Sequence, residues 1–178
     1  MGNVSQTKLV LVTGGVKSGK SSLACRCADS FSENPILIAT ARRFDHEFNS
    51  RIQRHIEDRP AHWQTIEAPI NLAVHLDTQA DQTIVIDCIG VWLTNLLVEV
   101  PEQRNAKIDE FFEALSRRTS PTIIVSNESG FGVIGADALT RQFVDELGLL
   151  NQTIAKQATH FATNFSGFPV WLKGNAFV

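Results

Sequence analysis

Apolar residues gather in five short runs that we interpret as β-strands. The runs are Lys8–Val12, Ile36–Thr40, Thr83–Cys88, Thr122–Asn127 and Phe161–Ser166. The first four are rich in consecutive valine, isoleucine and leucine, which is typical of parallel strands covered on both faces. Helical stretches lie between the runs, so we expect right-handed crossovers and a mainly parallel sheet flanked by helices.

The fifth run has a different pattern, because apolar residues alternate with small or polar ones from Phe161 to Phe165. Such alternation is typical of a strand with one solvated face. We therefore expect this strand at an edge of the sheet, or paired with a segment that the pattern does not identify.

Helical periodicity is visible in three segments. Residues Asn105–Arg118 place apolar side chains on one helix face, and the Ser-Pro pair that follows ends the helix. Residues Ala136–His160 form a longer helical stretch, in which Gly148 is expected to mark a kink or a junction of two helices. Phe44–Asp58 has an apolar stripe at four-residue steps and is predicted to be a helix.

An eight-residue stretch between the first strand and the next helix fits the pattern GxxxxGKS. Its residues are Gly14, Gly15, Val16, Lys17, Ser18, Gly19, Lys20 and Ser21. In this pattern the glycines let backbone N–H groups point at phosphate oxygens, and the helix adds its positive N-terminal end. Lys20 would reach the β- and γ-phosphates, and the Ser21 hydroxyl would hold Mg²⁺. A glycine-rich surface turn is the alternative, but the flanking strand and helix favour a triphosphate-binding loop.

These features predict an α/β fold that is P-loop NTPase-like (RecA-like), in a single domain over residues 1–178. A chain of 178 residues with 43% apolar content suits one core. The net charge of −3 argues against a nucleic-acid partner. The three cysteines lack metal-site spacing, and no apolar run approaches the ~20 residues of a membrane span. We therefore expect a cytoplasmic protein with reduced thiols.

Asp87 ends the third predicted strand and is our candidate for a second metal ligand. In P-loop proteins an acid at the end of a strand can hold Mg²⁺ directly or through water. Asp87 is alternatively a cap of the following helix, since aspartate is a favoured cap residue, and the two roles are compatible.

His55 is the candidate for covalent chemistry. On a helical wheel of Phe44–Asp58 it projects between Phe44 and Phe48, on the inward side, whereas His46 points away. This segment follows the second strand and leaves the sheet at the same edge as the glycine loop. The alternative is a hydrogen-bonded structural histidine, which is common at half-buried positions.

Two further segments carry polar groups suited to a nucleotide or a substrate. Arg59, Trp63 and Glu67 supply a cation, an aromatic face and an acid, a combination suited to purine recognition, although Trp63 is equally suited to core packing. Asn127 and Glu128 leave the fourth strand at the edge where ligands bind in open α/β folds. The alternative for this pair is a turn whose glycines serve the backbone.

Several long blocks, taken in order, resemble the bifunctional adenosylcobinamide kinase/adenosylcobinamide-phosphate guanylyltransferase family. The blocks are GGVKSGKS, ATARRFDHEFNSRIQRHIEDRPAHWQTIEAP, VIDCIGVWLTNLL, and VSNESGFGVI followed by LTRQFVDELGLLNQTIA. The resemblance spans nearly the whole chain. It implies phosphorylation of adenosylcobinamide by ATP or GTP, followed by GMP transfer from GTP to give adenosyl-GDP-cobinamide in adenosylcobalamin (vitamin B12) biosynthesis.

The resemblance also implies roles for individual residues. His55 corresponds to the histidine that carries GMP during the second reaction, and Gly14 to Ser21 correspond to the phosphate-binding residues, with Lys20 in a catalytic role. Residues that would complete the nucleotide and Mg²⁺ contacts are Ala39, Thr40, Ala41, Arg59, Glu67 and Asp87. A homotrimer is implied as well. A kinase in which His55 is structural, and a GTP-binding regulatory module, remain the alternative functions.

Overall fold

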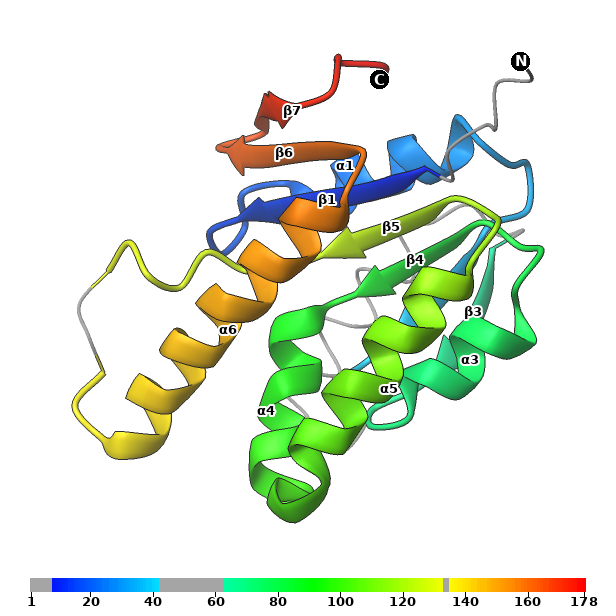
Figure 1. The fold of residues 1–178 in the computed structure, drawn as a ribbon. Helices are drawn as coiled ribbons and strands as arrows, with labels where there is room; N and C mark the ends of the chain where they lie inside the picture. The colour runs from blue at the N-terminus through cyan, green and yellow to red at the C-terminus, as the bar shows by residue number, and fades with distance from the viewer. Residues whose placement is uncertain (1–7, 42–62, 133–134) are drawn as a thin grey trace.

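The computed structural model describes residues 8–41, 63–132 and 135–178, which form one seven-stranded sheet with helices on both faces (Figure 1). The strands stand in the order β3-β2-β4-β5-β1-β6-β7. β1 to β6 are parallel to their neighbours, and β7 is antiparallel to β6. The strands are β1 (Leu9–Gly14), β2 (Ile36–Ala39), β3 (Gln64–Glu67), β4 (Ile84–Asp87), β5 (Thr122–Val125), β6 (His160–Phe165) and β7 (Phe168–Lys173).

Helices follow most of the strands and run back across the sheet. They are α1 (Lys20–Asp29), α3 (Leu72–Thr78), α4 (Ile89–Glu99), α5 (Arg104–Arg117), α6 (Ala138–Gln157) and the short 3-10 helix η1 (Pro101–Gln103). In Figure 1, α3, α4, α5 and α6 lie in front of the sheet, and α1 lies behind it. None of the helices in the described ranges is both long and apolar enough to cross a membrane.

Alternation along the strands divides the core into two layers. Leu9 and Leu11 of β1 join the layer beneath α3 to α6, whereas Val10 and Val12 join the layer beneath α1. All four side chains are at most 8% exposed. A strand that buries both faces needs apolar residues at every position, which explains the continuous runs in the sequence.

The predicted strands are confirmed to within a few residues, and α5 confirms the helix expected at 105–118. Of the two alternatives given for Gly148, the junction of two helices is wrong, because α6 continues as one helix from Ala138 to Gln157. The fifth run is β6, which pairs with β1 on one side and with β7 on the other, so the edge position expected for it is wrong. Its unidentified partner is β7. The helix predicted over Phe44–Asp58 lies outside the described residues.

Candidate nucleotide site at the carboxyl edge of the sheet

The glycine-rich loop connects the end of β1 to the start of α1. Gly19 is the N-cap residue of α1 with φ of +89°, a conformation that side chains with a Cβ rarely adopt. A Cβ on Gly14 would lie 2.5 Å from the Ser18 Oγ atom and 2.7 Å from the Asn164 carbonyl oxygen. Both glycines are therefore required by the backbone path, as the motif predicted.

Lys20 is the first residue of α1 and turns back over the loop. Its Nζ atom donates a hydrogen bond of 2.9 Å to the Gly15 carbonyl oxygen. The first turn of α1 contains no acidic residue, so the positive end of the helix is not neutralised locally. An ammonium group, a helix N-terminus and a glycine loop converge here, a combination that suits a phosphate group.

The second part of the site lies at the end of β4, where Asp87 is half-buried. Cys88 follows through a cis peptide bond and is the N-cap residue of α4, so Asp87 does not occupy the cap position. The Thr40 hydroxyl donates to the Cys88 carbonyl at 2.8 Å and accepts from the Cys88 N–H at 2.9 Å. The ends of β2 and β4 are thereby joined next to Asp87.

Electrostatics at Cys88 reflect the two charged candidates. Burial is the main cause and the Asp87 carboxylate a second cause of a raised pKa of the Cys88 thiol, whereas the Lys20 ammonium and two backbone N–H groups oppose them; the net pKa is about 11. Lys20 and Asp87 are therefore close enough to influence the same side chain. The thiol stays protonated at neutral pH and does not act as a nucleophile.

The loop after β5 lies directly beside the glycine loop. The backbone N–H of Glu128 donates to the Gly14 carbonyl at 3.1 Å. Asn151 of α6 holds the loop from the other side, since its Nδ2 donates to the Asn127 carbonyl at 3.1 Å and its Oδ1 accepts from the Ser126 hydroxyl at 2.6 Å. Asn127 and Glu128 are thus half-buried beside the glycine loop, and their contact with substrate stays a prediction.

Sequence comparison identifies the family to which this architecture belongs. The family described as cobinamide kinase / cobinamide phosphate guanyltransferase matches residues 10–172. The chain belongs to this family. A bifunctional adenosylcobalamin biosynthesis protein CobP from Pseudomonas aeruginosa is 40% identical over 92% of this chain and 96% of its own length. The bifunctional adenosylcobalamin biosynthesis protein CobU from Escherichia coli is 31% identical over 93% of this chain and 99% of its own length.

Among solved structures, the flagellar accessory protein FlaH from Methanocaldococcus jannaschii shares the fold with a TM-score of 0.50. It is 16% identical, and the match covers 94% of this chain and 79% of the FlaH chain. The likeness confirms the α/β, P-loop NTPase-like fold of this member of the cobinamide kinase family and says nothing further about its chemistry.

The other residues predicted for the family site are spread along the same edge. Ala39 ends β2, Thr40 and Ala41 follow it, and Glu67 ends β3 with an exposed side chain. Because β1 to β4 are parallel within one sheet, their ends share one edge with the glycine loop. The Thr40 side chain is fully buried against Cys88, so its hydroxyl has a structural role.

Trp63 resolves one alternative that the sequence left open. It is 9% exposed, packs in the core layer beneath α1, and its Nε1 donates to Asp29 Oδ1 at 3.1 Å. Core packing therefore explains Trp63, and base stacking by its ring is wrong. His55 and Arg59 lie outside the described residues, so their roles stay predictions.

Sequence reasoning missed two residues that contact the glycine loop. Asn164, at the end of β6, donates from Nδ2 to the Ser18 carbonyl at 2.7 Å. The backbone N–H of Gly167, in the turn between β6 and β7, donates to the same oxygen at 2.8 Å. Only the sheet order places these residues beside the loop, although an asparagine within an alternating strand is an unusual choice and was a signal available in the sequence.

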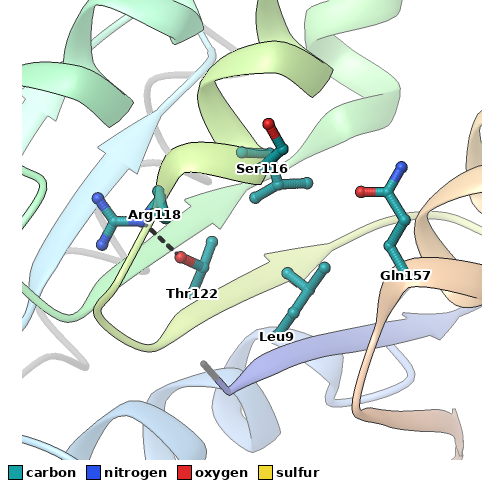
Figure 2. A pocket seen from close by; sticks show the side chains of 6 residues that line it. Leu9, Ser116, Arg118, Thr122 and Gln157 are labelled. Atoms are coloured by element: carbon teal, nitrogen blue, oxygen red, sulfur yellow. Dashed lines mark hydrogen bonds between the residues drawn. The ribbon is translucent and has the colours of Figure 1, made fainter. Parts of the chain in front are cut away.

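A separate pocket of about 180 Å³ lies at the opposite end of the sheet, where β1 and β5 begin (Figure 2). Arg118 lines it and is 6% exposed, with bonds to the Thr122 hydroxyl and to the carbonyls of Leu76, Gln79 and Gln82. Burial lowers the pKa of Arg118 to about 10, so the side chain is still charged at neutral pH. Its donors are used within the fold, and we interpret this arginine as structural.

Proposed function

We propose that this protein phosphorylates adenosylcobinamide with ATP or GTP and then transfers GMP from GTP to adenosylcobinamide phosphate. The observation that supports this most directly is the glycine loop with Lys20 and Asp87 at one edge of the sheet, in a chain whose residues 10–172 match the family. The glycine loop suits the triphosphate that both reactions consume.

In the first reaction the hydroxyl oxygen of the aminopropanol group attacks the γ-phosphorus, the bond from that phosphorus to the bridging oxygen breaks, and the nucleoside diphosphate leaves. The backbone amides of the loop and the Lys20 ammonium stabilise the charge that develops on the phosphate oxygens. Groups held by the fold in this way would need little reorganisation during the reaction.

The oxygen atoms of Ser21 and Asp87 fit a magnesium ion, which prefers hard oxygen ligands. Ser21 is half-buried in the first turn of α1, and Asp87 is half-buried at the end of β4. When bound, Mg²⁺ would neutralise part of the phosphate charge. We propose these two side chains as its protein ligands.

In the second reaction an imidazole nitrogen of His55 attacks the α-phosphorus of GTP, and pyrophosphate leaves. A phosphate oxygen of adenosylcobinamide phosphate then attacks the same phosphorus, and the phosphorus–nitrogen bond breaks to release adenosyl-GDP-cobinamide. Neutral imidazole is a competent nucleophile. The protonated Cys88 thiol does not compete with it. We propose Ala39, Ala41, Arg59 and Glu67 as residues lining the GTP site, with Thr40 buried behind them and joined to Cys88.

The test uses GTP labelled in the α-phosphate, added to the wild type, His55→Ala and a matched control, His75→Ala. His75 lies on α3 and has no place in the proposed chemistry. We expect acid-labile label on the wild type and on His75→Ala, and none on His55→Ala. Label on His55→Ala would contradict the histidine assignment, and transfer of the γ-phosphate with no labelled wild-type protein would indicate a kinase alone.

We propose a cytoplasmic homotrimer without a nucleic-acid partner, in keeping with the family resemblance and the net charge of −3. Analytical ultracentrifugation of the purified protein tests the trimer, and a monomeric mass at working concentration would contradict it.

A further inference from the structure

Two donors of the hairpin formed by β6 and β7 converge on one atom of the glycine loop. The Ser18 carbonyl oxygen accepts the side-chain N–H of Asn164 at 2.7 Å and the backbone N–H of Gly167 at 2.8 Å. Ser18 is 7% exposed and Asn164 is 1% exposed, so the bond from Asn164 is shielded from water, whereas Gly167 donates from an exposed turn. Shielded hydrogen bonds fix geometry more firmly than exposed ones because water does not compete for them.

Anchoring this carbonyl also orients the next backbone N–H. A trans peptide unit is planar, and its C=O and N–H bonds point in opposite directions. The cis bond recorded in the described residues is Asp87–Cys88, so the unit joining Ser18 to Gly19 is trans. When its carbonyl faces the hairpin, the Gly19 N–H faces away from the hairpin.

The hydrogen bond to the Ser18 carbonyl allows only one orientation of the Asn164 side-chain amide. A carbonyl oxygen can only accept, so Nδ2 and not Oδ1 faces Ser18. Asn164 stands opposite Gly14 in the pairing of β6 with β1, and a Cβ on Gly19 would lie 2.9 Å from Nδ2. The loop glycines and Asn164 therefore fit one another closely.

We expect Asn164 to contribute less to the stability of the fold than a buried amide side chain with all its hydrogen bonds made. Within the described part of the chain its Oδ1 atom is buried and accepts no hydrogen bond, which costs free energy. The Ser18 carbonyl would still keep the Gly167 donor if Asn164 were replaced by an apolar residue. We therefore expect the hydrogen bond from Asn164 to Ser18 to affect the orientation of the loop backbone more than the stability of the fold.

We infer that Asn164 is a positioning residue for nucleotide binding, which acts through the Ser18–Gly19 peptide to direct the Gly19 N–H at the β-phosphate. The inference rests on the proposed function, because it requires nucleotide phosphates in the glycine loop. It adds to that proposal a residue of the β6–β7 hairpin, which is far from the loop in sequence.

The experiment measures dissociation constants of the full chain for GTP, GDP and GMP by calorimetry. Asn164→Leu keeps the approximate shape of the side chain and removes its donor. We expect it to weaken GTP and GDP binding about tenfold, as the loss of a well-oriented buried donor does, and to leave GMP binding unchanged. A residue with a merely structural role would not alter the ratio of GTP to GMP affinity in the folded fraction.

Two further variants complete the design. Thr163→Val is the matched control, because the Thr163 hydroxyl is buried on the same strand and makes no hydrogen bond in the described residues. Asn164→Asp places a carboxylate against the Ser18 carbonyl, and its GTP affinity should recover as the pH is lowered and the carboxyl gains a proton to donate. This variant serves if the leucine variant does not fold.

The outcomes separate the inference from the proposed function. GTP affinity in Asn164→Leu within about twofold of the wild type would overturn the inference alone. Equal weakening of GTP and GMP would overturn it as well. Absence of GTP binding to the wild type would overturn the inference together with the proposed function.

Discussion

Substitutions of Thr40 test whether its hydroxyl group stabilises the contact between the ends of β2 and β4. Thr40 is fully buried after β2, and its hydroxyl both donates to and accepts from the backbone of Cys88. Thr40→Val replaces the hydroxyl by a methyl group of similar size. Thr40→Ser is the matched variant, because it keeps the hydroxyl and removes the methyl group instead.

The two substitutions differ in predicted cost. In Thr40→Val the Cys88 N–H loses the partner that the structure gives it, at about 1–3 kcal/mol for a buried donor. The Cys88 carbonyl keeps the Trp92 N–H at 3.1 Å, so its loss is smaller, about 0.5–1.5 kcal/mol. The sum is roughly 1.5–4.5 kcal/mol. Thr40→Ser loses one buried methyl group, about 1 kcal/mol.

Urea denaturation followed by tryptophan fluorescence measures both variants, since Trp92 lies in the core. With a urea dependence of about 2 kcal/mol per molar, Thr40→Val should shift the midpoint down by about 1–2 M and Thr40→Ser by about 0.5 M. A valine variant as stable as the serine variant would refute the reasoning, because it would mean that the Cys88 backbone does not depend on the hydroxyl.

Two more predictions concern other parts of the fold. Arg118→Met should lower the free energy of unfolding by about 2–4 kcal/mol, because the carbonyls around the guanidinium lose their donors. A methionine variant as stable as the wild type would contradict this prediction. It would show that burying the charge costs as much free energy as the hydrogen bonds of Arg118 contribute. Burial, with a smaller effect of the Lys8 cation, lowers the pKa of His160 below its ordinary value of 6.5. The unfolded chain therefore takes up a proton first, so this contribution to stability is present above about pH 6.5 and is lost as the pH falls through and below that value. Unfolding measured across this range should show a steeper loss for the wild type than for His160→Phe, and parallel curves would contradict the assignment.

Most of the sheet could be predicted from the sequence because its central strands bury both faces. A continuous apolar run of this length is assigned to a strand, because helices are usually longer. β3 was missed for the opposite reason: it is an edge strand of four residues, QTIE, in which three side chains are exposed. β7 was missed because it contains Pro169 and is also an edge strand, where backbone pairing on one side is sufficient.

The candidate site likewise has parts that could be predicted from the sequence and parts that could not. The glycine loop could be predicted because its chemistry is local: eight consecutive residues supply the amides, the ammonium and the helix end. Asp87 could be placed because a strand end is visible in the pattern. The bonds from Asn164 and Gly167 to Ser18 could not be predicted, since they depend on which strand lies next to β1, and that order is a property of the whole sheet.

The position of the hairpin in the chain also affects how the protein is made. β1 is the first strand that the ribosome releases, but its neighbours β5 and β6 follow more than a hundred residues later. Pairings of such long sequence separation form slowly. The Ser18 carbonyl cannot receive both of its donors until residues 160–167 have emerged. A chain whose translation stops before that point would carry the entire glycine motif and still lack the fixed geometry of the loop.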